Sequence, residues 1–345
     1  MSGVLEIDSA RSRRSIPQTG VHQQSVALFS ESEAAAWNMF QFNWRLLAGA
    51  AGVVVAGLMT TEFYIDPTGY LIISAIAALF WHSALRNIQS AKRSNTRVSY
   101  CLVAMAQILV AVSVLTTLTY LATSVALPSW DKTLLAWDLA LGFDFRSYLQ
   151  FINDHPRLLA ILGPSYSSIT WQMLAMGVIL PLVGNRLRSA QAICAFALAL
   201  LATTFISALV PAIGVYDTLG LKPSDFPYFE PQGYYDTLRD APLLRSGGLH
   251  GLTLSRLVGV LTFPSFHAAS AIFYTWAFWP LTLIRPLIVP WNIAMIAATP
   301  LGGGHYFVDV LAGILVAALA IRAALAISSR LSSTPVSERH CHEAQ

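Results

Sequence analysis

The chain has 345 residues, of which 55% are hydrophobic and only 11% are charged. Soluble globular domains carry about a quarter charged residues, so this composition excludes an ordinary soluble protein and indicates an integral membrane protein. The formal net charge is only +3, which gives no reason to expect nucleic acid or an acidic partner. The three cysteines, Cys101, Cys194 and Cys341, do not form a sensible set of disulfide pairs.

A polar segment at 1–43 comes before the first apolar run, which starts near Leu46, too far along for a cleavable signal peptide. Eight apolar runs follow, each long enough, or nearly so, for the roughly 20 residues that a helix needs to cross a bilayer. They lie at 45–61, 68–85, 98–122, 158–183, 190–211, 260–280, 284–300 and 304–327. We therefore predict an all-α fold, a polytopic transmembrane helical bundle of about eight spans at 44–327, followed by a cytoplasmic tail at 328–345.

Basic residues gather in every second connection of this series. The groups are Arg11, Arg13, Arg14 and Arg45 before the first span, Arg86, Lys92, Arg93 and Arg97 after the second, Arg186 and Arg188 after the fourth, Arg285 after the sixth, and Arg322, Arg330 and Arg339 at the end. Because basic loops stay on the cytoplasmic side, both termini are predicted to be cytoplasmic. Compact loops and the missing cleaved signal suit a bacterial inner membrane, so the opposite connections would face the periplasm.

Two of these outward connections are long. The connection at 123–157 mixes Trp, Phe and Leu with four Asp residues, so we expect one or two amphipathic helices along the outer interface, with a structural role. The connection at 212–257 is rich in Pro, Gly and Tyr and much longer than a usual helix–helix link. That profile is typical of a lid or a binding loop.

The candidate chemistry lies at two outward ends of spans. Pro264-Ser265-Phe266-His267 is predicted to begin the sixth span, and Gly302-Gly-Gly-His-Tyr-Phe-Val-Asp309 the eighth, on the same side of the membrane. His305 and Asp309 are four residues apart and would share one helix face. A buried Asp needs a partner, and Asp309 can orient the His305 ring so that its other nitrogen attacks an electrophile. His267 could then protonate the leaving group.

The expected electrophile is an anion such as phosphate. Helix N-termini present unpaired N–H groups, and the glycines let backbone approach a ligand closely. The predicted phosphate-binding residues are Ser265, Gly303, Gly304, Arg239, Arg245 and Arg256, with Lys222 as a further basic candidate in the outer loop.

Two alternatives stay open at this point. His267, His305 and Asp309 could bind zinc or iron, although glycine-rich helix starts suit an anion better than a cation. A lipid or anion transporter or flippase could use the same cluster without bond cleavage. We rank an enzyme without metal or other cofactor first, because the charged residues sit at one face of the membrane instead of its midplane.

These motifs resemble those of the type 2 phosphatidic acid phosphatase superfamily of membrane lipid phosphatases and phosphotransferases. Pro264-Ser265-Phe266-His267 is similar to its Pro-Ser-Gly-His motif, and His305 with Asp309 is similar to its His-x-x-x-Asp motif. The resemblance implies a six-helix phosphatase-like core, with His305 as the nucleophile that forms a phosphohistidine. It implies that Asp309 is the partner of His305 and that His267 is the acid for the leaving group.

Within that superfamily the motifs are similar to those of one branch. Ala298 and Thr299 stand where the phosphatase branch carries Ser-Arg, and its upstream Lys-x6-Arg-Pro motif is missing. The bulky Phe266 and the run Gly-His-Tyr-x-x-Asp-Val-x-Ala-Gly at 304–313 are similar to the inositol phosphorylceramide synthase-like (inositolphosphotransferase) branch. Its enzymes pass a phospho-headgroup to another lipid alcohol, and good resemblance covers roughly 203–315.

The sequence therefore predicts an integral membrane lipid phosphatase or phosphotransferase. Its substrate would be a phospholipid or other lipid phosphate, with a lipid alcohol as a possible acceptor and the site at the outer face. Hydrolysis and transfer differ only in the acceptor, and the motifs do not separate them.

Overall fold

The computed structural model describes residues 31–89 and 96–333; most of the predicted segment 1–43 and part of the predicted tail lie outside them. The described chain is 80% helical, with 13 α-helices, which agrees with the predicted helical bundle. The elements are α1 (Glu31–Thr60), β1 (Tyr64–Asp66), α2 (Pro67–Gln89), α3 (Thr96–Thr123), α4 (Asp131–Ala140), α5 (Phe145–Asp154), η1 (Pro156–Leu158), α6 (Leu159–Ser167), α7 (Ile169–Leu182), α8 (Arg186–Leu209), α9 (Val215–Thr218), η2 (Pro223–Asp225), α10 (Gln232–Ser246), β2 (Gly251–Thr253), η3 (Leu254–Arg256), α11 (Phe266–Phe278), η4 (Thr282–Ile284), α12 (Arg285–Gly303) and α13 (Phe307–Ser333).

Within the described ranges, six helices are long and apolar enough to cross a membrane: α1, α2, α3, α8, α12 with the short turn before it, and α13. Two predicted spans do not form one long helix in the structure. The span at 158–183 is divided at Ser168 into α6 and α7, and the span at 260–280 contains the shorter helix α11. Both regions carry proline, Pro164 inside α6 and Pro264 just before α11, which disfavours one long regular helix. The count of eight spans stays a prediction.

Helix α1 begins earlier than the apolar composition indicates. It starts at Glu31, inside the segment 1–43 that the sequence set apart as polar. Ala36, Met39 and Phe40 are fully buried in the core of the bundle, so tertiary packing carries this helix beyond the apolar run.

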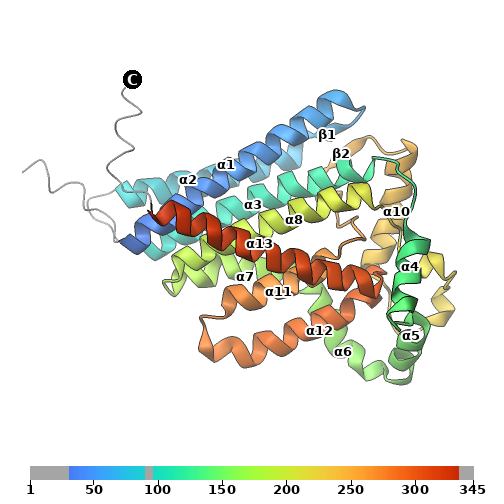
Figure 1. Cartoon of the computed structure of the whole chain (residues 1–345). Coiled ribbons are helices and arrows are strands. Elements are labelled where there is room, and N and C mark those ends of the chain that lie inside the picture. The colour runs from blue at the N-terminus through green and yellow to red at the C-terminus, as the bar shows by residue number, and fades with distance from the viewer. Residues whose placement is uncertain (1–30, 90–95, 334–345) are drawn as a thin grey trace, which may run out of the picture.

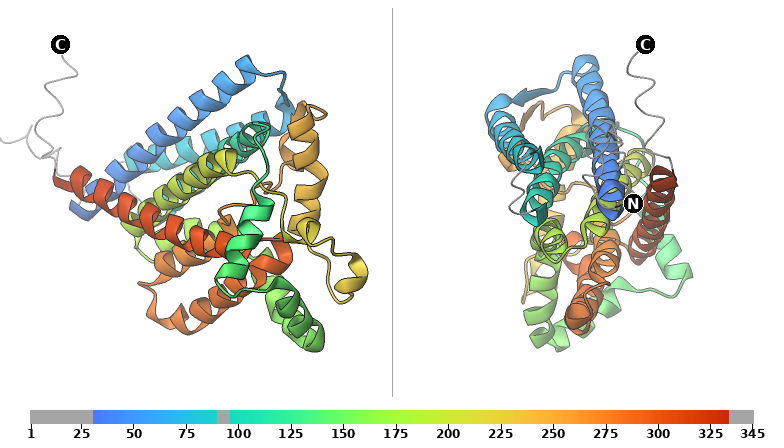
Figure 2. Two further views of the ribbon diagram at one scale, coloured as in Figure 1. Left: turned by 45° about the vertical axis from the view of Figure 1, so that its right-hand side comes forward. Right: turned by 90° about the vertical axis from the view of Figure 1, so that its left-hand side faces the viewer.

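The long helices lie side by side, and the irregular segments gather at one end of the bundle. Figure 1 shows α1, α2, α3, α8 and α13 packed along one another, with the start of α1 and the end of α13 at the same end. Figure 2 shows that α4, α5 and α10 collect at the opposite end. The two long connections predicted to face outward, 123–157 and 212–257, are therefore at the same end of the molecule.

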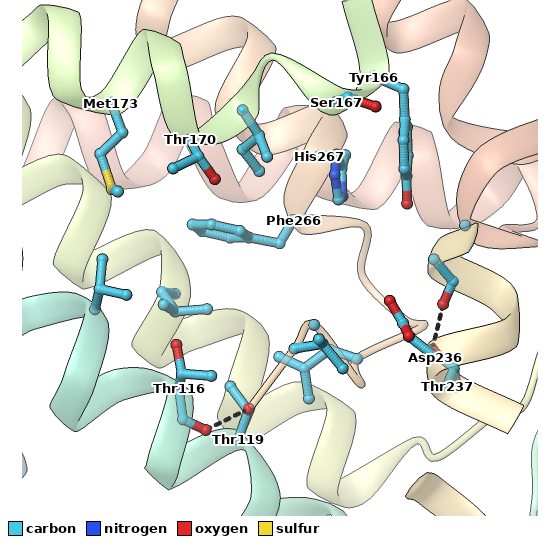
Figure 3. A pocket seen from close by; sticks show the side chains of 18 of the residues that line it. Thr116, Thr119, Tyr166, Ser167, Thr170, Met173, Asp236, Thr237, Phe266 and His267 are labelled. Carbon is cyan, nitrogen blue, oxygen red and sulfur yellow. Dashed lines mark hydrogen bonds between the residues drawn. The ribbon is translucent and has the colours of Figure 1, made fainter. Parts of the chain in front are cut away.

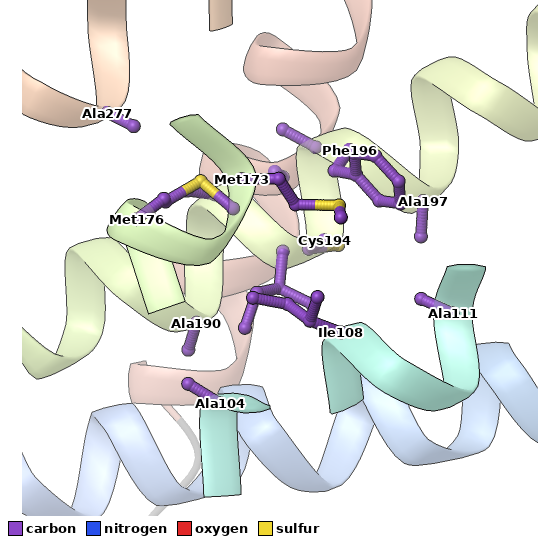
Figure 4. Packing of buried hydrophobic residues seen from close by; sticks show 14 of the residues in the cluster. Ala104, Ile108, Ala111, Met173, Met176, Ala190, Cys194, Phe196, Ala197 and Ala277 are labelled. Atoms are coloured by element: carbon purple, nitrogen blue, oxygen red, sulfur yellow. The ribbon is translucent and has the colours of Figure 1, made fainter. Parts of the chain in front are cut away.

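Close helix packing fills the centre of the bundle. Figure 4 shows Ile108 of α3 beside Met173 and Met176 of α7 and the small side chains of α8. A Cβ added to Gly177 of α7 would lie 2.5 Å from Cδ1 of Ile108, so these helices approach closely only because this position has no side chain. Small residues at helix contacts are the usual means of tight packing in a bilayer, where apolar lipid gives little hydrophobic drive between helices.

Polar side chains also tie α1 to its neighbours. The Asn43 side-chain amide donates to Gln107 Oε1 at 3.2 Å and to the Ala190 carbonyl at 2.9 Å. Gln107 in turn donates to the Phe40 carbonyl at 2.6 Å. The pairs join α1 to α3 and α8 and satisfy polar groups that water cannot reach.

The irregular end of the bundle is largely folded. The connection at 123–157 forms the helices α4 and α5, within the one or two expected there. In the connection at 212–257, α10 is followed by β2, which pairs in parallel with β1 in the register Tyr64↔Gly251. This pairing fastens the connection between α1 and α2 to the longest connection of the chain.

Candidate active site

The first motif forms the start of α11. Ser265 is the N-cap residue, and its hydroxyl accepts a hydrogen bond from the Ala268 backbone N–H. The Ser265 backbone N–H donates to the Asp309 carbonyl at 3.0 Å, which ties α11 to the first turn of α13. A Cβ on Gly313 would lie only 2.2 Å from the Ser265 carbonyl oxygen, so Gly313 permits this contact. His267 is thereby fixed in the first turn of α11, where helix N–H groups have no acceptor within the helix.

The second motif differs from the prediction in its local structure. Gly302 and Gly303 are the last residues of α12, and Gly304 ends that helix in the left-handed conformation, at φ +67°. His305 lies in the short link before α13, which begins at Phe307. The triple glycine therefore terminates one helix and does not begin the next, because glycine adopts positive φ without the clash that a Cβ would cause.

His305 and Asp309 nevertheless form a pair. Nδ1 of His305 lies 3.3 Å from Oδ2 of Asp309, and the Tyr306 backbone N–H donates to the same oxygen at 2.9 Å. Asp309 is fully buried and His305 is 3% exposed. The carboxylate is thus held at the N-terminus of α13, and it holds one nitrogen of the imidazole so that Nε2 is left for other contacts.

Helix α4 positions this link from the side. The Asp138 carboxylate accepts the backbone N–H groups of Phe307 and Val308, both at 2.8 Å, and so caps α13 from a separate helix. One face of α4 also carries Asp131, which accepts the Gly214 backbone N–H and the Tyr306 hydroxyl, both at 2.9 Å. Two of the four acids expected to be structural therefore hold the residues that directly follow His305, and Asp131 also holds Gly214.

We expect replacement of Asp138 by Asn to destabilise the protein by about 2 kcal/mol, because an amide has one acceptor oxygen for two buried N–H donors and no charge for the helix end. Asp138 is 1% exposed, and burial raises its pKa although the two backbone donors lower it in part. Thermal unfolding of the purified protein in detergent measures the effect. Asp154→Asn is the matched control, since Asp154 is exposed and, among the described residues, accepts a side-chain hydrogen bond from Gln150 alone. An unchanged Tm in Asp138→Asn would contradict the capping role.

The connection at 212–257 supports the same link from the other side. The Val215 backbone N–H donates to the Gly304 carbonyl at 2.8 Å, and the Tyr216 hydroxyl donates to the Leu301 carbonyl at 2.9 Å. Gly214 has φ +135°, and a Cβ there would lie 2.7 Å from the Gly304 carbonyl oxygen. Glycine is therefore required at Gly214 both for the backbone conformation and for the close approach.

The two histidines line one cavity of about 480 Å³. Its polar lining includes Tyr166, Gln232, Asp236, Thr237, His267 and His305. Its apolar lining includes Val112, Met173, Phe196, Leu200, Leu261 and Phe266. Figure 3 shows Tyr166, His267, Asp236 and Thr237 at one side of the space and Met173 at the other. The cavity therefore offers a polar region beside the histidines and an apolar region between α3, α7, α8 and α11.

The predicted phosphate-binding residues are not all at this cavity. Among the described residues that line it, Gly303 is present, whereas Ser265, Gly304 and the three arginines are not. Arg239 forms ion pairs with Asp236 at 3.0 Å and with Asp240 at 2.7 Å. A guanidinium N–H of Arg245 donates to the Leu127 carbonyl, and Arg256 is exposed.

The pair formed by Arg239 and Asp240 belongs to a structural network. Burial raises the pKa of Asp240, but the hydrogen bonds from Arg239 and Tyr120 outweigh it, and the net shift is downward. The Tyr120 hydroxyl donates to Asp240 at 2.6 Å and accepts the Val258 backbone N–H at 3.1 Å. This network joins α10 to α3 and to the segment that leads into α11.

Sequence reasoning missed several residues of the cavity. Tyr166, Gln232 and Asp236 line it beside the histidines but belong to no recognised motif. A signal existed for Tyr166, because Pro164 and a run of serines interrupt the apolar stretch at this point. Within the described residues no group of three His, Cys, Asp or Glu side chains could hold a metal ion, so the alternative of a zinc or iron site gains no support.

Fold and site together define a helical membrane protein in which a buried His–Asp pair and a second His meet at one cavity. The model of the PAP2 superfamily matches residues 132–323, and the chain belongs to this superfamily. Its members are generally phosphatases, so membership indicates phosphatase-type activity on phosphate esters. The match runs from α4 into α13. No curated protein and no solved structure matches the chain.

Proposed function

We propose that this protein is an integral membrane phosphatase or phosphotransferase that acts on a lipid-linked phosphate through a phosphohistidine at His305. The observation that carries the proposal is the arrangement of His305: Asp309 holds its Nδ1, and its ring lines the cavity that His267 also lines. A nucleophile oriented by a carboxylate, with a second titratable ring beside it, is the arrangement that covalent catalysis requires.

In the proposed reaction, Nε2 of His305 attacks phosphorus and the bond between phosphorus and the leaving alcohol oxygen breaks. His267, protonated at the start, gives its proton to that oxygen. Water or a second alcohol then attacks the phosphohistidine and gives its proton to His267, and the bond to His305 breaks. Asp309 stabilises the positive charge on the His305 ring, and the mechanism needs no metal.

The shape of the cavity supports a lipid substrate. If a phosphate lies beside the histidines, an apolar chain attached to it would occupy the region lined by Met173, Phe196 and Leu200. Burial of such a chain is favourable by about 0.8 kcal/mol for each CH₂ group. The connection at 212–257, whose helix α10 lines the cavity, would then cover the headgroup.

We further propose that the site faces the periplasm of a bacterial inner membrane and that both termini are cytoplasmic. The distribution of Lys and Arg supports this orientation. The phosphate contacts predicted for Ser265, Gly304, Arg239, Arg245 and Arg256 remain part of the proposal, and each needs a rearrangement that brings it to the cavity. Gly303 already lines it.

The acceptor distinguishes the two forms of the proposed activity. Water gives a lipid phosphatase, and a lipid alcohol gives a phosphotransferase of the inositol phosphorylceramide synthase-like kind. The motif resemblance at Phe266 and 304–313 favours transfer. A cavity with both polar and apolar walls accepts either water or an amphipathic alcohol, so product analysis decides between them.

The test traps the covalent intermediate. Wild-type protein is incubated with phospholipids labelled in the phosphate. The reaction is quenched in alkali, in which phosphohistidine survives, and the labelled residue is located by peptide mapping. We expect the label on His305, none in His305→Gln, and full labelling in the control His82→Ala, since His82 is exposed on α2 away from the cavity. The melting temperature of each variant confirms that it is folded.

A parallel incubation with a lipid alcohol shows whether the label ends in free phosphate or in a new lipid. Turnover that survives in His305→Gln would overturn the catalytic role of His305. No turnover of any labelled lipid by the wild type would favour the alternative of a lipid or anion transporter, which a flip assay in liposomes then tests.

A further inference from the structure

The lining of the cavity contains no Lys or Arg side chain, as far as the chain is described. The carboxylate of Asp236, which lines it, is already paired with Arg239 at 3.0 Å. Catalysis at phosphorus depends on donors placed at the oxygens on which charge accumulates. If the proposed function holds, His305 supplies the nucleophile and His267 the acid, so the cavity needs another donor for these oxygens.

Tyr166 of α6 lies against His267, and its hydroxyl lies near His305. Its ring stacks on the imidazole of His267, with ring centroids 4.0 Å apart and planes 6° from parallel. Figure 3 shows the two rings face to face, with the Tyr166 hydroxyl pointing into the cavity. The face of His267 is therefore covered by a ring from a separate helix, which restricts the direction of its nitrogens.

Three glycines make room for this tyrosine. A Cβ on Gly302 would lie 2.8 Å from the Tyr166 ring, one on Gly303 would lie 2.9 Å from its hydroxyl, and one on Gly233 would lie 2.3 Å from the same hydroxyl. The helices α12 and α10 thus present bare backbone to Tyr166 from two sides.

The hydroxyl of Tyr166 is placed for a ligand near His305. No group in the described part of the chain forms a hydrogen bond with it, whereas the hydroxyl of Tyr274, on the same cavity, is committed to the Ile169 carbonyl at 2.8 Å. The position of a Cβ on Gly303 is 2.9 Å from this hydroxyl and also 2.8 Å from Nε2 of His305. The two polar atoms therefore border the same small space, which the missing Cβ leaves empty.

We propose that Tyr166 binds the phosphoryl group during transfer: its hydroxyl donates a hydrogen bond to a phosphoryl oxygen beside Nε2 of His305, and its ring holds His267 in line with the leaving group. The inference rests on the proposed function and adds the Tyr166 hydroxyl to the phosphate donors proposed above. A neutral donor suffices beside the protonated His267 and the positive end of α11.

Two variants separate the roles of the hydroxyl and the ring. In Tyr166→Phe the stacking stays and the donor is lost, so we expect kcat to fall about 100-fold with KM changed less than about threefold. The pH profile of kcat/KM should keep its shape. In Tyr166→Leu the stacking is also lost, so we expect a larger fall together with a shifted pH profile, because His267 is no longer held by the ring.

Orthovanadate gives a readout that does not depend on the substrate. It resembles a phosphoryl group in transfer, and we expect it to raise the melting temperature of the full-length wild type in detergent. Tyr166→Phe should need at least about tenfold more vanadate for the same rise. The control is Tyr148→Phe, because the Tyr148 hydroxyl donates to the Ala297 carbonyl away from the cavity. This variant should respond to vanadate as the wild type does.

The outcomes separate this inference from the proposed function. Wild-type kcat and vanadate response in Tyr166→Phe, with His305 still labelled, would overturn the role of Tyr166 alone. A fall in melting temperature that accounts for the lost activity would show that the hydroxyl is merely structural. If neither labelling of His305 nor a vanadate effect occurs in the wild type, the proposed function fails and the role of Tyr166 fails with it.

Discussion

Replacing Asp309 by Asn is expected to lower kcat about 10³- to 10⁴-fold while the protein stays folded. The carboxylate accepts from Nδ1 of His305 and from the Tyr306 backbone N–H through the same oxygen. An amide oxygen in the same place can accept both hydrogen bonds, but it brings no charge to stabilise the ring once His305 is bonded to phosphorus. It also allows the ring to adopt the wrong tautomer, and a loss of this size is typical when a carboxylate that orients a catalytic imidazole is replaced by an amide.

Stability should change little in this variant. Asp309 is fully buried, and its other oxygen, Oδ1, has no hydrogen-bond partner within the described part of the chain. A neutral amide of the same shape removes a buried charge, which offsets the weaker hydrogen bonds. The checks are kcat with labelled lipid and thermal unfolding in detergent, with Asp154→Asn as the surface control. Activity within about tenfold of wild type in Asp309→Asn would contradict the role of this carboxylate.

Replacing Gly303 by Ala is the second change with a large expected effect. Gly303 has an ordinary helical conformation at the end of α12, so alanine fits the backbone. Its Cβ, however, would lie 2.5 Å from the His305 ring and 2.9 Å from the Tyr166 hydroxyl. Because contacts this short force the rings to move, we expect kcat to fall by about 100-fold, the loss that a misplacement of about 1 Å can cause.

The matched control for this change is Gly163→Ala. Gly163 lies in α6, one turn from Tyr166, and, apart from its own helix backbone and chain neighbours, no described atom lies within 4 Å of an added Cβ. Both substitutions add one methyl group to a helical glycine, so the comparison isolates the contacts that the added Cβ makes at Gly303. Equal activity of the two variants in the lipid assay would show that the space beside Gly303 is not used in the reaction.

The sequence predicted the parts of this protein that depend on local composition and spacing. Long apolar runs give helices wherever they occur, since backbone polar groups inside a bilayer must pair within the segment. The pair formed by His305 and Asp309 also followed from the sequence. A spacing of four residues brings the two side chains together even though His305 lies just outside the helix. The two acids of α4 could be read only as part of an interface helix, since their partners Gly214, Tyr306, Phe307 and Val308 are remote in the chain.

The local form of the second motif could not be read from its residues. A run of three glycines is compatible with a helix start, which exposes N–H groups, and with a helix end, which needs positive φ. The packing of α12 against α6 and α10 selects the helix end, because the glycines contact Tyr166 and Tyr234 at distances that leave no room for a Cβ atom. Arg239 does not line the cavity, because Asp236, which does, and Asp240 pair with its guanidinium on α10.

The sequence by itself thus determined a helical membrane protein with a buried His–Asp pair, since apolar length and i, i+4 spacing act over a few residues. Only the tertiary structure decided what surrounds that pair. The stacking of Tyr166 on His267, the capping of α13 by Asp138 and the shared cavity each join segments far apart in the chain. Such contacts arise from the packing of whole helices, and no pattern within one segment specifies which side chain of another will meet it.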